Sequence, residues 1–173
     1  MTLELKKINV ENYAQEKDRM YALAERIWPN PSSLENIKHS LDRWGNSGTE
    51  SGTYFYITQE EQDIGITGYY IPNLETGDFG LRHHGITVSG TGRIALDALV
   101  SHLREEYGSN FKRMIELIPK GREELIDVFR KWGFVLSTDG VPNWEPKKDY
   151  YEYVMVKEVG EWILKKSDLM AGI

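Results

Sequence analysis

The feature that most constrains the fold is a turn of small residues, Ser89-Gly90-Thr91-Gly92, which separates two different periodicities. Before it, residues 79–88 (FGLRHHGITV) end in a β-branched stretch that is typical of a strand. After it, residues 93–107 repeat apolar side chains at the spacing of an amphipathic helix. Since glycine has no side chain, an anion can approach the unpaired N–H groups at the start of such a helix. The alternative is that the turn only redirects the chain and caps the helix.

Further strands and helices surround this turn in a regular order. Strands are expected at residues 3–10, 53–59, 63–71, 79–88, 112–118, 134–138 and 150–156. Helices are expected after Asn12, over residues 34–44 with Ser33 as the cap, over 93–107, and over 122–132, where Gly133 ends the helix. The order β-α-α-β-β-β-α-β-α-β-β predicts a single α/β (α+β) domain over residues 1–159, with a mixed central sheet flanked by helices and a short tail at 160–173.

Composition excludes several classes of site and partner. The 173 residues include no cysteine, so a disulfide framework, a thiolate metal site and a cysteine nucleophile are ruled out, and no metal site is expected. The net charge of −6 and the lack of a basic stretch argue against nucleic acid as a partner. No apolar run is long enough for a membrane span, and residues 1–12 lack a signal-peptide core. We therefore expect a cytoplasmic protein without a membrane partner, and a homodimer is compatible with the sequence.

Two known phosphate-binding motifs fit the turn poorly. Gly85 and Gly90 have the spacing of a Walker loop, but Thr91 occupies the position that requires lysine. Residues 90–95 match the dinucleotide pattern G-x-G-x-x-A, and Glu116 falls near the position of a ribose-binding acid. That motif normally opens a long series of parallel βαβ units, which this chain lacks. Dinucleotide binding is therefore the least favoured interpretation.

The ordered set of motifs resembles the GNAT superfamily of N-acetyltransferases over residues 3–157. The family turn reads roughly Gln/Arg-x-x-Gly-x-Gly/Ala, and residues 87–92 (TVSGTG) match its glycines but not its leading residue. A later family signature reads roughly Asn-x-x-Ala-x-x-x-Tyr-x-x-x-Gly-Phe. Here Arg122, Leu125 and Phe129 replace its asparagine, alanine and tyrosine, and Gly133-Phe134 match its end.

The resemblance implies an N-acetyltransferase that moves the acetyl group of acetyl-CoA directly to a primary amine of a small molecule or peptide in a ternary complex. The turn is then expected to bind the pyrophosphate of the cofactor, and residues 84–88 its pantetheine arm. The alternative of the same fold is a non-catalytic acyl-CoA-binding or interaction module. The residues implied in cofactor binding are Ile86, Thr87, Val88, Ser89, Gly90, Thr91, Gly92, Arg93, Ile94, Arg122 and Phe129.

Three residues are candidates for the catalytic base. Glu116 lies in an apolar strand, where desolvation raises the pKa of a carboxyl toward the working range of a base. An ion pair with Arg113 or a histidine is the alternative role. His84 and His83 are the other candidates; as neighbours in a strand they are expected to point to opposite faces unless a bulge intervenes. For each histidine taken singly, the sequence favours a packed, hydrogen-bonded role.

Two further features are the source of the proton for the departing thiolate and the residues that line the acceptor pocket. Phe129 has no hydroxyl, so the family's tyrosine acid is absent and the proton must come from water or a group such as Tyr150 or Tyr151. The resemblance implies that the acceptor pocket is walled by Trp28, Trp144 and Tyr150.

Overall fold

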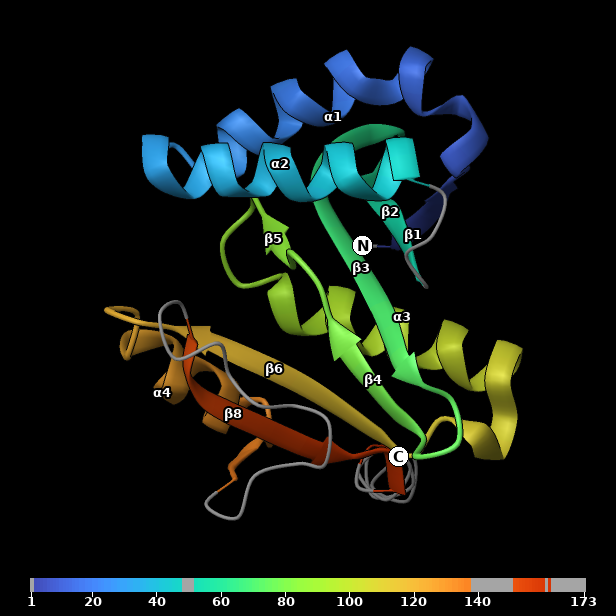
Figure 1. Cartoon of the computed structure of the whole chain (residues 1–173), viewed down its shortest axis with the longest axis vertical. Coiled ribbons are helices and arrows are strands. Elements are labelled where there is room, and N and C mark those ends of the chain that lie inside the picture. The colour runs from blue at the N-terminus through green and yellow to red at the C-terminus, as the bar shows by residue number, and fades with distance from the viewer. Residues whose placement is uncertain (1, 48–51, 138–150, 161, 163–173) are drawn as a thin grey trace. The chain divides into compact units, whose positions relative to one another are not determined.

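The fold was established from a computed structural model, which describes residues 2–47, 52–137, 151–160 and 162 (Figure 1). Trp144 and Tyr150, both predicted for the acceptor pocket, lie outside these residues. The chain divides into two compact units, one formed by Met1–Tyr70 with Leu81–His102 and the other by Ile71–Gly80 with Leu103–Ile173. Each unit is thus assembled from two separate stretches of sequence.

The element order agrees with the prediction, with one correction. The elements are β1 (Leu3–Ile8), a 3-10 turn (Val10–Asn12), α1 (Tyr13–Ile27), α2 (Pro31–Ser47), β2 (Thr53–Gln59), β3 (Gln62–Asn73), β4 (Asp78–Leu81), β5 (Gly85–Ile86), α3 (Gly92–Tyr107), a 3-10 turn (Gly108–Asn110), β6 (Arg113–Pro119), α4 (Glu124–Lys131), β7 (Val135–Leu136) and β8 (Tyr151–Glu158). The strand predicted over residues 79–88 is wrong as a continuous element, because the chain breaks between Leu81 and Gly85. The described residues form an α+β fold with mostly antiparallel strands, as expected.

In the first unit, β2 lies between β1 and β3, and β5 pairs with the far side of β3. Tyr54 and Tyr56 belong to a core that β2 shares with α1 and α2. Ile57 lies in a second core with Ala95 of α3, and the ring of Phe55 contacts that of His102 at 5.1 Å. Both faces of β2 are therefore covered, which explains why residues 53–59 form a nearly continuous buried run instead of an alternating one.

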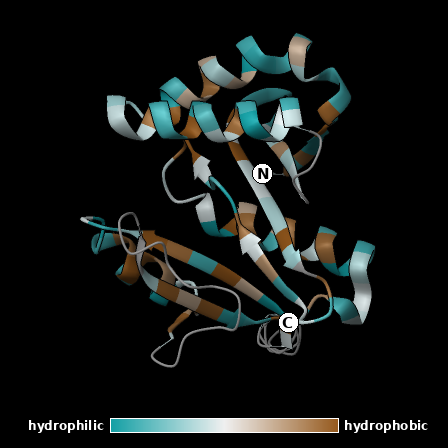
Figure 2. Ribbon diagram, in the orientation of Figure 1, coloured by the Kyte–Doolittle hydropathy of each residue, from teal (hydrophilic) through white to brown (hydrophobic). Residues whose placement is uncertain are grey.

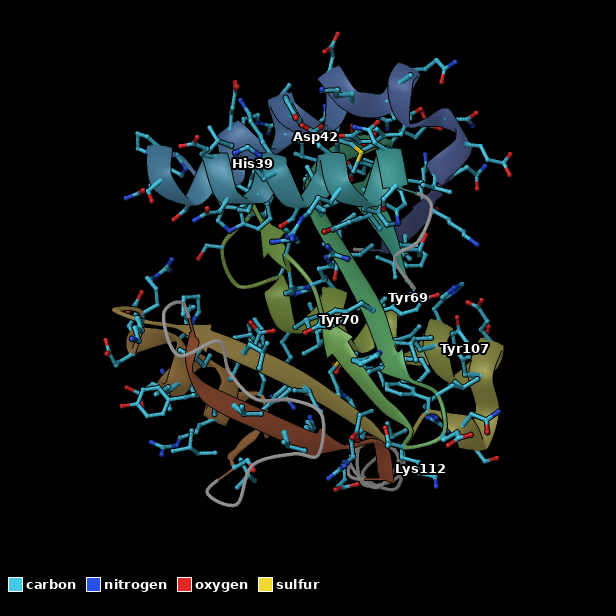
Figure 3. All side chains as sticks on the ribbon, in the orientation of Figure 1. His39, Asp42, Tyr69, Tyr70, Tyr107 and Lys112 are labelled. Atoms are coloured by element: carbon cyan, nitrogen blue, oxygen red, sulfur yellow. The ribbon has the colours of Figure 1, made fainter. Side chains whose placement is uncertain are left out.

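Helices α1 and α2 pack side by side in this unit (Figure 1), and both alternate hydrophilic and hydrophobic bands (Figure 2). Figure 3 labels Asp42 on α2; its Oδ1 accepts hydrogen bonds from the hydroxyls of Tyr13 (2.5 Å) and Tyr21 (2.7 Å) of α1. The cap of α2 is Asn30, whose Oδ1 accepts from the amides of Ser32 and Ser33. Ser33 was predicted as the cap and is instead in the first turn, because the helix begins at Pro31.

In the second unit, β6 lies between β4, which is parallel to it, and β8, which is antiparallel. The β4–β6 register runs from Asp78↔Arg113 to Gly80↔Ile115. The Arg113 guanidinium donates to both carboxylate oxygens of Asp78, at 2.6 and 2.9 Å. Glu116 is consequently the first residue of β6 beyond the pairing with β4.

Candidate functional site

The turn before α3 has the geometry of an anion cradle. Gly90 has a φ of 82°, and no atom lies within 4 Å of the position that a Cβ would take. Glycine is therefore required there for its left-handed backbone and not by crowding. The Thr91 hydroxyl donates to the Val88 carbonyl at 2.6 Å, and the Thr91 carbonyl accepts the amide of Ala95. The amide N–H groups in the first turn of α3 have no acceptor within the helix, and they lie at an exposed, open turn.

The segment that leads into this turn has two backbone edges, and β3 pairs with one of them. Thr87 donates its amide (2.7 Å) and its hydroxyl (3.0 Å) to the carbonyl of Ile64. Ile64 and Thr87 therefore form a hydrogen-bonded pair. Because hydrogen-bonded and non-hydrogen-bonded pairs alternate in an antiparallel ladder, the neighbouring pair, Gly65↔Ile86, is a non-hydrogen-bonded pair. The N–H and C=O of Ile86 therefore point away from β3. This is the backbone that an extended ligand can pair with, over a shorter stretch than the predicted residues 84–88.

His84 joins β3 to the turn. Its Nε2 lies 2.7 Å from the carbonyl oxygen of Gly92, so this nitrogen carries the hydrogen and donates. Its Nδ1 lies 2.8 Å from Oγ1 of Thr67 and accepts from that hydroxyl. Burial lowers the pKa of His84 to about 4, which keeps the ring neutral. Since both nitrogens are engaged, His84 fixes the first residue of α3 and leaves no lone pair for a substrate proton.

His83 is held in a strained conformation. Its φ of 47° places a residue with a bulky ring in the left-handed region, and the chain breaks there between β4 and β5. The Tyr54 hydroxyl lies 2.7 Å from Nδ1, and the two rings stack at 5.9 Å between centroids. Among the described residues, only Tyr54 forms a hydrogen bond with this ring. Burial, together with Arg82 and Arg43, lowers the pKa of His83 to about 3.

Aromatic rings surround His83 on the side of α1 and α2. Trp28, which was predicted for the acceptor pocket, contacts the His83 ring edge-on at 6.4 Å between centroids. Trp44 of α2 packs against Tyr54 at 5.1 Å. A Cβ at Gly85 would lie 2.4 Å from the Trp28 ring, so glycine is needed for this close approach. Tyr54 was not predicted as a site residue; the signal for it was a tyrosine in a buried strand, since its hydroxyl needs a polar partner.

Glu116, the first candidate for the base, is a half-buried carboxyl on β6. Burial raises its pKa well above the ordinary value. The ion pair with Arg113 considered from sequence is wrong, because the Nε and Nη2 groups of that guanidinium donate to Asp78, which is its ion-pair partner. Within the described residues no hydrogen bond or ion pair offsets the desolvation of the Glu116 carboxylate.

Arg122 and Phe129, both predicted to contact the cofactor, differ in their surroundings. Arg122 is exposed and forms an ion pair with Glu124. Phe129 is 5% exposed, and its ring packs edge-on against Trp132 (5.2 Å) and Phe134 (5.1 Å). Phe129 is thus part of an aromatic core in the second unit, where it contributes packing and no hydroxyl.

Neither a metal cluster nor a membrane span is found among the described residues. No group of three or more histidine, aspartate or glutamate side chains in residues 2–47, 52–137, 151–160 and 162 is arranged to hold a metal ion. None of the described helices has both the length and the apolar character that crossing a bilayer requires.

Comparison with solved structures shows that the fold is that of N-acetyltransferases of the GNAT type. An acetyltransferase from Thermus thermophilus superposes with a TM-score of 0.65 at 16% identity, over 91% of this chain and 97% of that one. The spermidine N-acetyltransferase of Vibrio cholerae in complex with CoA and spermine gives 0.60 at 10% identity, over 93% and 98%. The Campylobacter jejuni N-acetyltransferase PseH gives 0.55 at 14%, over 90% and 97%. No family model and no curated protein matches the sequence.

Proposed function

We propose that this protein is a cytoplasmic N-acetyltransferase that transfers the acetyl group of acetyl-CoA to the primary amine of a small molecule or peptide. The observation that carries the proposal is the turn before α3, where the positive φ of Gly90 and the Thr91–Val88 hydrogen bond open a helix N-terminus to an anion. We assign the cofactor pyrophosphate to this turn, with Arg93 adjacent, and the pantetheine amide to the outward backbone of Ile86. The shared fold of the solved N-acetyltransferases supports this assignment.

The chemistry follows from the groups present. The amine nitrogen attacks the thioester carbonyl carbon, the C–S bond breaks, one amine proton is removed, and the CoA thiolate takes up a proton. The sequence has no cysteine to carry a thioester intermediate, which favours direct transfer. Glu116 is assigned as the base, because its raised pKa brings a carboxylate nearer the working pH. His84 is a positioning residue of the turn, and His83 is the second candidate for the base.

The buried ring of Phe129 favours a second candidate function. It cannot donate a proton to the thiolate, so water or another group such as Tyr150 or Tyr151 must supply that proton. A protein of this fold that binds acyl-CoA without transfer is the alternative consistent with that absence.

A two-stage experiment tests the proposal. CoA is expected to raise the melting temperature of the protein, whereas NAD at the same concentration leaves it unchanged. Acetyl-CoA is then incubated with a panel of amino acids, amino sugars, polyamines and peptides, and products are detected by intact mass. Acetylation of at least one amine above the rate without protein supports the enzyme. CoA binding without any acetylated product supports the binding module, and stabilisation by NAD alone contradicts both.

A further inference from the structure

Two ring nitrogens near the break between β4 and β5 have no hydrogen-bond partner among the described residues. One is Nε1 of Trp28, and the other is Nε2 of His83, whose Nδ1 makes the contact with Tyr54. Both Trp28 and His83 are half-buried. In the described part of the chain, neither nitrogen is among the fully buried polar atoms that lack a partner. Both nitrogens are therefore accessible to a ligand.

The two rings meet beside Gly85. A Cβ at Gly85 would lie 2.4 Å from Cζ2 of Trp28 and 2.9 Å from its Cε2, the atom bonded to Nε1. The indole thus presents its nitrogen-bearing edge to residue 85, and its centroid lies 6.4 Å from that of the His83 ring. A hydrogen bond to an oxyanion is about 2.7–3.1 Å long, so two such bonds to one oxygen span about 6 Å. One oxygen atom between the rings can therefore accept from both.

Both nitrogens are hydrogen-bond donors. An indole nitrogen carries a hydrogen and accepts none. The phenol of Tyr54 is a stronger acid than the N–H of a neutral imidazole, so its hydroxyl donates to Nδ1 of His83 and the ring hydrogen lies on Nε2. Burial lowers the pKa of His83 to about 3, which keeps the ring neutral. Two neutral donors without a lone pair cannot take a proton from an amine, and they select an oxygen atom.

Resting on the proposed acetyl transfer, we propose that Trp28 and His83 are catalytic residues that donate hydrogen bonds to the carbonyl oxygen of the acetyl thioester, and that Tyr54 is a positioning residue for His83. The cofactor pyrophosphate is assigned to the turn before α3 and the pantetheine amide to Ile86. The arm therefore continues past Ile86 toward Gly85, and the thioester at its end reaches the two rings.

The backbone strain at His83 supports this role. A φ of 47° costs stability in a residue with a bulky ring, and such strain is retained where a side chain must be held in one direction. Tyr54 holds that direction from within the core, where it is 0% exposed, through its hydroxyl and through its ring, which stacks on His83 at 5.9 Å. Donors fixed in this way need no reorientation when charge develops on the substrate.

The donor pair acts on the charge that forms during transfer. When the amine nitrogen attacks the carbonyl carbon, the π electrons of the C=O bond move to the oxygen, and the two N–H groups stabilise the oxyanion. No proton leaves either ring. The C=O bond then re-forms, and the C–S bond breaks with its electron pair on the CoA sulfur. The base removes the amine proton, and the thiolate takes up a proton from water or another hydroxyl group.

Two cofactor analogues test the proposal without an amine. In ethyl-CoA, a thioether, a methylene group replaces the carbonyl group of acetyl-CoA. Calorimetric titration should give a Kd for acetyl-CoA about tenfold or more below the Kd for ethyl-CoA. Equal Kd values for the two compounds overturn the proposal. Nitrogen NMR of the His83 ring should place its hydrogen on Nε2, and a hydrogen on Nδ1 contradicts the assignment of this ring as a donor.

Ring variants show whether these nitrogens contact the carbonyl oxygen. Trp28→Phe keeps a ring without Nε1, and His83→Asn suits the left-handed backbone but does not reach the position of Nε2. Each should reduce the preference for acetyl-CoA over ethyl-CoA by about threefold or more, raise the infrared stretching frequency of the bound thioester carbonyl, and lower kcat about 10²-fold. An unchanged preference in either variant overturns the proposal.

Three further variants separate hydrogen bonding from packing. His83→Gln, whose amide reaches the position of Nε2, should restore part of the preference and of kcat. Tyr54→Phe should lower the preference for acetyl-CoA and leave the Kd of ethyl-CoA unchanged, because only the orientation of the His83 ring is released. Trp44→Phe, the same change in a ring that packs on Tyr54 at 5.1 Å, is the matched control and should leave the preference unchanged.

The outcomes separate this proposal from the proposed function. If acetyl-CoA is preferred through Trp28 and His83 but no amine is acetylated, the assignment of the carbonyl contacts stands and acetyl transfer fails. If an amine is acetylated while Trp28→Phe and His83→Asn retain the parent's preference and kcat, transfer stands and the assignment fails. If these variants raise only the KM of the amine, the nitrogens bind the acceptor, which also overturns the assignment. A protein that binds neither CoA nor acetyl-CoA contradicts both proposals.

Discussion

Replacing Gly90 by aspartate should weaken CoA binding through charge and not through misfolding. The position has a φ of 82° and open space around it, so any L residue there costs backbone strain but no clash. That strain is about 1–2 kcal/mol for an ordinary residue and less for Asn or Asp, which tolerate the left-handed region. Gly90→Asn therefore has nearly the same shape and strain as Gly90→Asp, without the charge.

The expected loss follows from Coulomb's law. A carboxylate on residue 90 would lie about 6 Å from a pyrophosphate held at the first turn of α3, where each pair of unit charges repels by about 0.7 kcal/mol in water. Two phosphate charges give about 1.4 kcal/mol, a tenfold loss of affinity, and a lower local dielectric increases it. Because the turn is exposed, high salt should screen much of the repulsion.

Calorimetric titration with CoA at low and high salt measures this effect, with thermal unfolding as the check on folding. Gly108 provides the control position: its φ is 56°, it also has open space, and it follows the opposite end of α3. Gly108→Asp should cost similar stability and leave the Kd of CoA unchanged. If Gly90→Asp weakens CoA no more than Gly90→Asn or Gly108→Asp does, the pyrophosphate does not bind at this turn.

Three further outcomes are expected. A carboxyl whose pKa is raised in the folded state destabilises that state as pH rises from the ordinary pKa of 4.5 through the raised pKa, so Glu116→Gln should be more stable than the parent at pH 8 and equal to it at pH 4 by urea unfolding. The turnover of Glu116→Gln should fall about 10²- to 10⁴-fold, and its rate should lack the parent's rise with pH. A loss of stability at pH 8 with normal turnover contradicts the assignment of Glu116 as the base. His84→Ala should raise the Kd of CoA about tenfold with kcat nearly unchanged, and His84→Gln, which can still donate to the Gly92 carbonyl, should restore part of the affinity; a loss confined to kcat would instead indicate proton transfer. Arg113→Met should lower the free energy of unfolding by about 3–5 kcal/mol at neutral pH, because the Asp78 carboxylate, which is 1% exposed, stays buried without its partner. An unchanged midpoint of urea unfolding would refute this expectation.

Sequence periodicity predicted the element order because each helix and strand expresses its own repeat locally. The glycine turn was also predictable, since positive φ and an open helix start are properties that glycine signals directly. The left-handed backbone of His83 was not, because nothing in the local sequence requires a histidine to leave the β region. The interpretation of residues 79–88 as one strand therefore failed at the position where the candidate site is formed.

Contacts between distant residues account for the remaining differences. His84 depends on Thr67 and on the Gly92 carbonyl, and Arg113 is taken by Asp78, which precedes it by 35 residues. Side-chain pairings of this kind depend on strand register, which the sequence pattern leaves open. The cap at Asn30, in contrast, was available from the sequence, since asparagine before proline is a typical helix start.

The strained backbone at position 83 has a consequence for how this protein responds to selection. Histidine in the left-handed region costs about 1–2 kcal/mol that glycine avoids. A library of variants sorted for heat resistance alone is therefore expected to replace His83 by glycine or asparagine. A library sorted for amine turnover is expected to retain it, so the residue recovered at position 83 reports which of the two pressures acted.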